Sequence, residues 1–216
     1  MRLPRIPIVK DVIPYLVTCI VLAIAAYLLM PLTSLIPLTL LVIIAFFFRD
    51  PDRKTPHLPD ALIAPADGRI IEIKEVFEEK FLDDVSQRVS IFLSLFDVHV
   101  VRSPSDGKVG YISYEKGRFR PAFHKLAPHE NEKNFIGICN SHAKVLMTQV
   151  AGMLARRIVC YVKEGDTLVQ GQRVGLIKFG SRVDIYIPTS VEITVSKGQR
   201  VRAGETIIGR FKTEIL

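Results

Sequence analysis

The fold class is indicated by two stretches of the chain that repeat one another, VKEGDTLVQG (residues 162–171) and VSKGQRVRAG (residues 195–204). Each stretch carries a pair of glycines with an apolar residue between them, Leu168 in the first and Val201 in the second. Short apolar segments punctuated in this way are typical of strand, tight turn and strand in small β-sandwiches and barrels. The repeat therefore predicts a mostly β domain.

A second repeat supports the same interpretation. PADGRI (residues 65–70) is matched by PSDGKV (residues 104–109), and in both a Pro-x-Asp-Gly turn leads into a β-branched residue that opens a strand. Residues 182–187 alternate between polar and apolar side chains until Pro188 ends the strand.

Two segments between the expected strands are less regular. Residues 75–84 fit either a short helix or a charged hairpin. Residues 117–134, which contain prolines and histidines, predict a long loop. Long loops on a β scaffold often carry or cover a site.

Composition sets broad limits on function. A chain of 216 residues with 49% hydrophobic and 24% charged residues is neither disordered nor fibrous. Its formal net charge of +7 is compatible with a polyanionic partner such as nucleic acid or an anionic membrane. The cysteines number only three, so we expect no disulfide framework and a reducing compartment.

The apolar excess, seen in a mean hydropathy of +0.27, lies near the start of the chain. Residues 12–30 and 35–48 are uncharged and as helices would span roughly 28 Å and roughly 21 Å. The first run matches a bilayer core, and the second is either a short span or a re-entrant segment. Basic residues flank the pair but do not lie between the runs, so the positive-inside rule places both ends in the cytoplasm.

We therefore expect residues 1–54 to form a hydrophobic membrane hairpin, with residues 55–216 as the functional domain on the cytoplasmic face of the cell membrane. A cleavable signal peptide is the alternative, since the basic start, the apolar stretch and Ala23-Ile24-Ala25 match its three regions. The apolar run continues past this point and a second run follows, which favours an anchor.

Most common catalytic signatures are missing from the sequence. The chain has no Gly-rich dinucleotide fingerprint, phosphate-cradling loop, His-Glu-x-x-His motif or serine-hydrolase elbow. Cys139 and His142 have the spacing of half a metal site, which His124, His129 or Cys160 could complete. Without a second closely spaced pair we predict no metal site, and we interpret the two residues as a strand-end cysteine and a surface histidine.

The sequence FGSRVD (residues 179–184) is more informative. A Gly-Ser step alone is an ordinary turn. Here Gly180 and Ser181 stand between the apolar stretch 174–179 and the alternating strand that follows, so a small nucleophile is held where two strands join. If the backbone is strained there, the Ser181 hydroxyl can attack the Gly180 carbonyl.

Four motifs follow one another along the chain: APADG (residues 64–68), FDVHVVRSP (residues 96–104), Asn131-Glu132 in the long loop, and FGS (residues 179–181). Together they closely resemble the short form of the phosphatidylserine decarboxylase family. Their order and spacing and the apolar N-terminal anchor all agree with it. The resemblance extends from about residue 49 to the end of the chain.

The resemblance implies an enzyme that makes its own pyruvoyl cofactor. Ser181 would attack the Gly180 carbonyl to give an ester, and β-elimination followed by loss of ammonia would leave a pyruvoyl group at residue 181. The resulting β chain (residues 1–180) and α chain (residues 181–216) would form a heterodimer, with a higher oligomer as an open alternative. The ketone would form a Schiff base with the serine amine of phosphatidylserine and act as an electron sink for decarboxylation to phosphatidylethanolamine. The phosphoserine head is common to diacyl and archaeal ether lipids.

The resemblance also suggests roles for two further residues. His99 matches the histidine of the family's Asp-Tyr/Val-His stretch and is the expected acid and base, because imidazole titrates near neutrality. Asp67 matches the aspartate of the Pro-Ala-Asp-Gly motif and would orient that base. Asp67 also fits a simple turn residue, an interpretation that Asp106 in the second copy of the motif shares.

One departure from the family concerns the self-cleavage base. Long members carry a second histidine three residues after the first, where this chain has Arg102, and a guanidinium stays protonated. Either His99 serves both steps, or His124 or His142 supplies the base. Arg102 and His124 are the expected substrate-binding residues, with Arg102 holding a phosphate or carboxylate.

A membrane-anchored adaptor is the alternative function. Adaptors with biotinyl/lipoyl-like β-sandwich or barrel repeats also begin with an anchor and carry similar turns, and we expect this chain to have such repeats within a mostly β (α+β) fold. Against the adaptor function, no lysine occupies the expected carrier turn and no long helical hairpin interrupts the domain. Nucleic-acid binding is not expected, because basic and aromatic residues are not interleaved and anionic lipid accounts for the charge.

Overall fold

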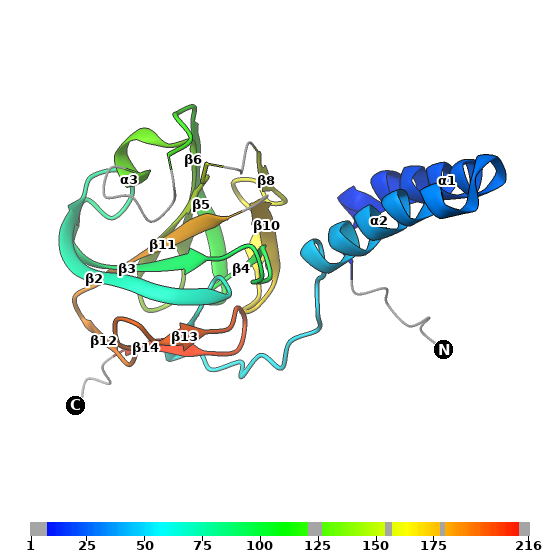
Figure 1. Cartoon of the computed structure of the whole chain (residues 1–216). Coiled ribbons are helices and arrows are strands. Elements are labelled where there is room, and N and C mark those ends of the chain that lie inside the picture. Colours follow the sequence, from blue (N-terminus) through cyan, green and yellow to red (C-terminus); the bar gives the residue numbers. More distant parts are fainter. Residues whose placement is uncertain (1–7, 121–126, 154–156, 178–179, 212–216) are drawn as a thin grey trace. The chain divides into compact units, whose positions relative to one another are not determined.

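The structure is a computed structural model that describes residues 8–120, 127–153, 157–177 and 180–211. The chain divides into two compact units between Asp52 and Arg53 (Figure 1). The assignment of residues 1–54 as a membrane anchor and of residues 55–216 as the functional domain stays a prediction.

The first unit is helical. Its elements are a 3₁₀ turn η1 (Lys10–Val12), helix α1 (Ile13–Leu29), a second 3₁₀ turn η2 (Pro31–Ser34) and helix α2 (Leu35–Phe47). Helix α1 ends before Pro31, which cannot continue the hydrogen-bond ladder, and the Thr33 hydroxyl donates to the Met30 carbonyl at 2.7 Å. The Val9 amide donates to the Phe48 carbonyl at 3.0 Å, so the two basic ends of the hairpin lie together.

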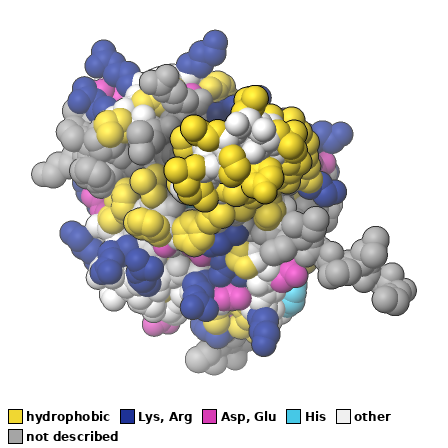
Figure 2. Space-filling model, turned by 45° about the vertical axis from the view of Figure 1, so that its right-hand side comes forward, with side chains coloured by type: hydrophobic (Ala, Val, Ile, Leu, Met, Phe, Trp, Pro, Cys, Tyr) yellow, Lys and Arg dark blue, Asp and Glu magenta, His cyan; other side chains and the backbone are white. Residues whose placement is uncertain are grey.

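Most large side chains of this unit are exposed and apolar, and Figure 2 shows hydrophobic side chains over much of its surface. The segment Lys10–Leu29 has 20 residues and is long and apolar enough to cross a membrane, whereas the apolar segment Pro31–Phe47 is shorter. The unit therefore buries few of its own apolar groups, as expected when lipid is the solvent.

The second unit is almost entirely β structure. Its strands are β1 (Ala61–Ile63), β2 (Gly68–Glu78), β3 (Asp84–Leu93), β4 (Val100–Arg102), β5 (Gly107–Glu115), β6 (Lys133–Cys139), β7 (Lys144–Val150), β8 (Ile158–Cys160), β9 (Thr167–Leu168), β10 (Arg173–Ile177), β11 (Ser181–Pro188), β12 (Val191–Ile193), β13 (Arg200–Val201) and β14 (Ile207–Phe211). A short helix, α3 (Ala127–Glu130), precedes β6. The prediction of a mostly β fold is confirmed; the biotinyl/lipoyl-like description stays a prediction.

The strands form one large curled sheet and two small ones (Figure 1). The large sheet has eight strands in the order β13-β2-β3-β11-β7-β6-β5-β9, and the small sheets have the orders β1-β14-β12 and β4-β10-β8. Neighbouring strands are antiparallel. Strand β11 lies near the middle of the large sheet, where Val183, Ile185 and Ile187 contribute to the hydrophobic core.

The two kinds of sequence repeat bind one another. The Gly198 amide donates to Ile70 O at 2.7 Å, and the Gly165 amide donates to Val109 O at 2.8 Å, so each VxxG turn docks on the strand that follows a PxDG turn. Gly165 and Gly198 share a φ of 90°, a left-handed conformation that favours glycine. The similarity between the two repeats thus reflects the same local structure formed twice.

The structure describes the whole of the first irregular segment and part of the second. Residues 75–84 form a hairpin between β2 and β3 and not a helix, because the Glu78 carboxylate accepts the backbone amides of the turn, those of Lys80, Phe81 and Leu82, at 2.8–2.9 Å. The described part of the expected loop 117–134 is mainly irregular, apart from α3 and the start of β6.

Candidate functional site

Gly180 and Ser181 lie at the start of β11, shortly after the end of β10. Ser181 is the first residue of β11 and pairs with Leu93, the last residue of β3. On the other side, β10 ends at Ile177, whose amide donates to the His99 carbonyl at 3.2 Å. Pairing of β11 and β10 with their neighbours therefore brings His99 to the Gly180-Ser181 bond.

The His99 ring is fixed by two hydrogen bonds. Its side chain is fully buried, and Nδ1 lies 2.9 Å from the carbonyl oxygen of Asp97. The Gly180 amide donates to Nε2 at 3.2 Å. Because a carbonyl only accepts and an amide only donates, this pattern assigns the proton to Nδ1 and leaves a lone pair on Nε2. His99 thus has the tautomer that a base next to the Gly180-Ser181 bond requires.

Ser181 and Gly180 have the features of a reactive bond. Ser181 is fully buried, and among the described residues its hydroxyl has no hydrogen-bond partner. Such an orphaned polar group is rare in protein interiors and costs stability. Gly180 has a φ of 51°, in the left-handed region. A buried, unpaired hydroxyl after a left-handed glycine can act as an internal nucleophile.

Asp67 has partners other than His99. Its Oδ2 accepts from Arg53 Nη2 at 2.8 Å, and its Oδ1 accepts from the Ala203 amide at 2.7 Å. Asp106 makes the equivalent contact in the other repeat, where its Oδ1 accepts from the Gln170 amide at 2.7 Å. The structure therefore gives Asp67 the turn contact that it shares with Asp106, and no direct contact accompanies its predicted role of orienting His99.

Arg102 is buried within the β unit. Only 4% of the residue is accessible, and its Nη1 donates to the Gly171 carbonyl at 3.0 Å. It pairs with Arg173, at the opposite end of β10 from Ile177. The expected role of Arg102 in binding a phosphate or carboxylate stays a prediction.

Of the alternative bases, the structure describes His142 but not His124. His124, which was also expected to bind substrate, lies outside the described residues. His142 is in the turn before β7, whereas Ser181 lies near the other end of that strand, where Val150 pairs with Arg182. Of the histidines considered as bases, the described structure brings His99 to the reactive bond.

Cys139 and His142 do not form part of a metal site in the described structure. Within residues 8–120, 127–153, 157–177 and 180–211 no group of three or more His, Cys, Asp or Glu side chains could hold a metal ion. His142 instead stacks on Phe211, with ring centroids 4.9 Å apart.

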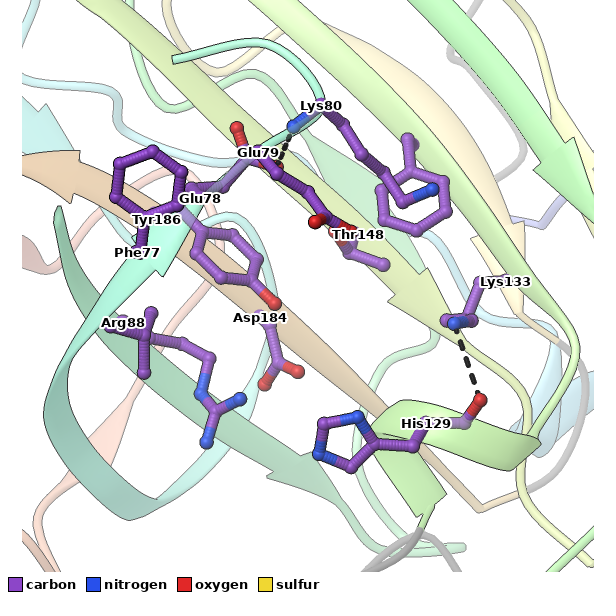
Figure 3. A pocket seen from close by; sticks show the side chains of 12 residues that line it. Phe77, Glu78, Glu79, Lys80, Arg88, His129, Lys133, Thr148, Asp184 and Tyr186 are labelled. Atoms are coloured by element: carbon purple, nitrogen blue, oxygen red, sulfur yellow. Dashed lines mark hydrogen bonds between the residues drawn. The ribbon is translucent and has the colours of Figure 1, made fainter. Parts of the chain in front are cut away.

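A polar cavity of about 330 Å³ opens on the other face of β11. Figure 3 shows Arg88, Asp184, Tyr186, His129 and Lys133 around it. Alternate residues of a strand point to opposite faces, so Asp184 and Tyr186 lie on the side away from Ser181, Val183 and Ile185. The cavity is thus separate from the reactive bond, although both depend on the same strand.

Charged groups beside this cavity hold the sheet in place. Arg182 Nε donates to Asp184 Oδ1 at 2.6 Å, and Arg88 Nη2 donates to Glu72 Oε2 at 2.6 Å. Burial raises the pKa of Glu72, but the hydrogen bond and charge of Arg88, followed by the charge of Arg182, bring it below its ordinary value. Burial, and next the charge of Asp184, raise the pKa of Tyr186 to about 12.

Several of these contacts were not predicted from the sequence. The Asp97 carbonyl that orients His99 lies within the quoted FDVHVVRSP motif, and its spacing from the histidine was an available signal. The pairing of Arg53 with Asp67 and the burial of Arg102 had no such signal, because both depend on segments far apart in the chain.

Comparison with known proteins gives a consistent result. A family model described as phosphatidylserine decarboxylase matches residues 40–209. A relative from Carboxydothermus hydrogenoformans is 47% identical over 199 residues, covering 92% of this chain and 93% of the relative. One from Desulfotalea psychrophila is 41% identical over 213 residues, covering 98% and 100%, and one from Chlorobium phaeobacteroides (strain BS1) is 47% identical over 167 residues, covering 77% and 78%. All three are named phosphatidylserine decarboxylase proenzyme.

The raised pKa of Tyr186 predicts a loss of stability in alkaline solution. The folded chain keeps the phenolic proton up to about pH 12, while the unfolded chain loses it near 10, so between these values the folded state binds more protons. Below about pH 10 the neutral phenol therefore makes its full contribution to the free energy of unfolding. Between about pH 10 and about pH 12 this contribution falls by about 1.4 kcal/mol for each pH unit.

Chemical unfolding of the full chain and of Tyr186→Phe in detergent, repeated from about pH 9 to about pH 12 in steps of about one pH unit, measures this effect. The free energy of unfolding should fall more steeply for the wild type than for the variant. Parallel curves would show that Tyr186 ionises normally in the folded chain.

Proposed function

The chain belongs to the phosphatidylserine decarboxylase family, and from this premise we propose that it converts phosphatidylserine to phosphatidylethanolamine. The family model matches most of the chain, and the relatives from Carboxydothermus hydrogenoformans and Desulfotalea psychrophila are matched over nearly their whole length. The observation that carries the site assignment is the buried Ser181 hydroxyl, which no described residue engages, directly after Gly180, whose amide donates to His99 Nε2.

Self-processing would begin at the Gly180-Ser181 bond. The Ser181 oxygen attacks the Gly180 carbonyl carbon as its proton passes to a base, for which we assign His99 Nε2. Return of a proton to the amide nitrogen breaks the peptide bond and leaves an ester between Gly180 and the Ser181 side chain. Loss of the Ser181 α-proton then expels the Gly180 carboxylate, and hydrolysis of the remaining enamine releases ammonia.

The pyruvoyl group left at residue 181 supplies an electrophilic ketone that can take up electrons as carbon dioxide leaves an attached amino acid head. The residues present fit this group, because Ser181 is buried at the end of β11 with a hydroxyl that no described residue engages. His99 would hold and return protons there, since its Nδ1 is anchored on the Asp97 carbonyl and its Nε2 accepts the amide of Gly180, the residue before the proposed cleavage point.

The two products would stay together after cleavage. The α chain, residues 181–216, begins with β11, which pairs with β3 along its whole length and also with β7. The same chain supplies β12, β13 and β14, and β14 pairs with β1 of the β chain. These shared sheets support a heterodimer of β chain and α chain as the active form.

A membrane location is supported by the apolar segment Lys10–Leu29 and by a lipid substrate. The basic residues at both ends of the helical unit favour the cytoplasmic face by the positive-inside rule. The adaptor alternative has no support from the relatives, which are named as proenzymes, and it would assign no role to the unpaired Ser181 hydroxyl.

The direct test is decarboxylation of phosphatidylserine by the purified full chain in mixed detergent micelles. We expect carbon dioxide and phosphatidylethanolamine from the wild type, loss of activity after treatment with borohydride, which reduces ketones, and no activity from Ser181→Ala. A fully cleaved wild type that leaves phosphatidylserine unchanged would contradict the proposal.

His99 is expected to set the rate of self-processing. His99→Ala should slow the appearance of the two fragments by about 10²–10⁴-fold, the usual contribution of general base catalysis. Cell-free synthesis followed by denaturing electrophoresis gives the time course. His142→Ala is the matched control and should process at the wild-type rate; processing of His99→Ala at that rate would show that another group is the base.

The two repeats provide a test of Asp67. If it only holds its turn, Asp67→Ala and Asp106→Ala should each lower the free energy of unfolding by about 1–3 kcal/mol, the cost of an unmade hydrogen bond to a charged group. Both variants should then process at the wild-type rate. A block of processing in Asp67→Ala, with normal processing in Asp106→Ala, would instead support the predicted role of Asp67 in orienting the base.

A further inference from the structure

Loops from several strands meet around Gly180. Strand β3 ends at Leu93 opposite Ser181, and β7 ends at Val150 opposite Arg182, so the segments that follow these strands leave the sheet on either side of the start of β11. The β3–β4 loop also carries His99. The reactive bond is therefore bordered by connecting loops and not by the flat face of a sheet.

The tips of these loops are apolar and exposed. Leu95 and Phe96 in the β3–β4 loop are 41% and 75% accessible, and Met153 after β7 is 56% accessible. We call these three residues the apolar rim. A Cβ placed on Gly180 would lie 3.8 Å from Leu95 Cδ2, so the rim reaches the bond that is cut.

The β3–β4 loop presents its tip in a defined turn. The Ser94 amide and hydroxyl both donate to Asp97 Oδ2, at 2.9 and 2.7 Å, which closes the loop beneath Leu95 and Phe96. The backbone carbonyl of Asp97 also accepts a hydrogen bond from Nδ1 of the His99 ring. One short loop thus couples the exposed apolar side chains to the ring beside the Gly180-Ser181 bond.

Basic side chains accompany the rim. Arg157, just before β8, is exposed, and the 72% exposed side chain of Arg200 lies 3.7 Å from Asp97. The opposite end of β3 is more acidic, because the exposed Phe77 there stands beside three exposed carboxylates and one exposed lysine, namely Glu79, Asp83, Asp84 and Lys80. Apolar groups flanked by arginines suit an anionic bilayer surface, whereas apolar groups flanked by carboxylates do not.

We infer that the apolar rim is a membrane-contacting surface that dips into the headgroup region of an anionic phospholipid bilayer, and that the reactive bond thereby opens onto the lipid heads. The inference rests on the proposed function, since a lipid substrate keeps its tails in the bilayer and its head has to reach residue 181. The apolar side chains of the rim leave water and pack at the boundary between headgroups and acyl chains. The charges of Arg157 and Arg200 interact with the anionic headgroups.

The chain offers a direct probe of this contact, because it contains no tryptophan. Phe96→Trp places the sole indole at the rim, and Phe77→Trp is the matched control at the other end of β3. Each full chain is reconstituted into vesicles of phosphatidylcholine and phosphatidylglycerol whose acyl chains carry bromine, a quencher of indole fluorescence.

Emission from Phe96→Trp should be blue-shifted and quenched by the brominated lipid, while Phe77→Trp should remain unquenched. No quenching at either position would overturn the inference. A blue shift at position 96 without lipid quenching, accompanied by a larger particle, would mean that a second copy of the chain covers the rim, and would also overturn it. These measurements need no catalysis, so they stand even if the proposed function fails.

A kinetic test uses the double variant Phe96→Asp/Met153→Asp. Charges in place of apolar rim side chains should lower the ratio of activity on phosphatidylserine in vesicles to activity on monomeric dihexanoyl phosphatidylserine by about tenfold or more. Phe77→Asp should leave that ratio within about twofold of the wild type. An equal loss on both substrates in the double variant would mean that the rim acts on the site itself and would overturn the membrane contact.

Discussion

The hydrogen bonding of β11 to β3 and β7 is the constraint on which the rest of the site depends. Pairing begins at Ser181 itself, so the reactive residue is held by the middle of the large sheet although its hydroxyl has no described partner. On the face away from Ser181, the Arg182–Asp184 pair at 2.6 Å holds the same strand. Because the pairing of β11 with β3 and β7 does not depend on the peptide bond before Ser181, the proposed cleavage would not require the fold to change.

The β3–β4 loop supplies the histidine that lies next to Gly180. It orients His99 through the Asp97 carbonyl and leaves the Nε2 lone pair facing the Gly180 amide. Since the same turn carries the exposed Leu95 and Phe96, these apolar side chains lie in one short loop with the His99 ring, next to Gly180.

Much of this arrangement could be predicted from the sequence. The glycine-punctuated repeats predicted a mostly β fold because local turn chemistry determines them, and the quoted motifs pointed to the family that the comparisons support. Contacts between distant segments could not be predicted in this way. Asp67 meets Arg53 and Ala203, and Arg102 is buried against Gly171, because of how the strands fold back on one another. Likewise, the alternation of residues 182–187 predicted a strand, but not that its polar face would line a cavity with Asp184 and Tyr186.

We propose above that the chain cuts itself before Ser181 and converts that residue to a ketone. The intact mass of the purified wild-type chain, measured under denaturing conditions, reports on both steps at once. We expect two chains, residues 1–180 and residues 181–216, with the second lighter by one ammonia than a peptide that begins with serine. A single uncut chain from a folded preparation, or a second chain that begins with an unmodified serine, would contradict this proposal.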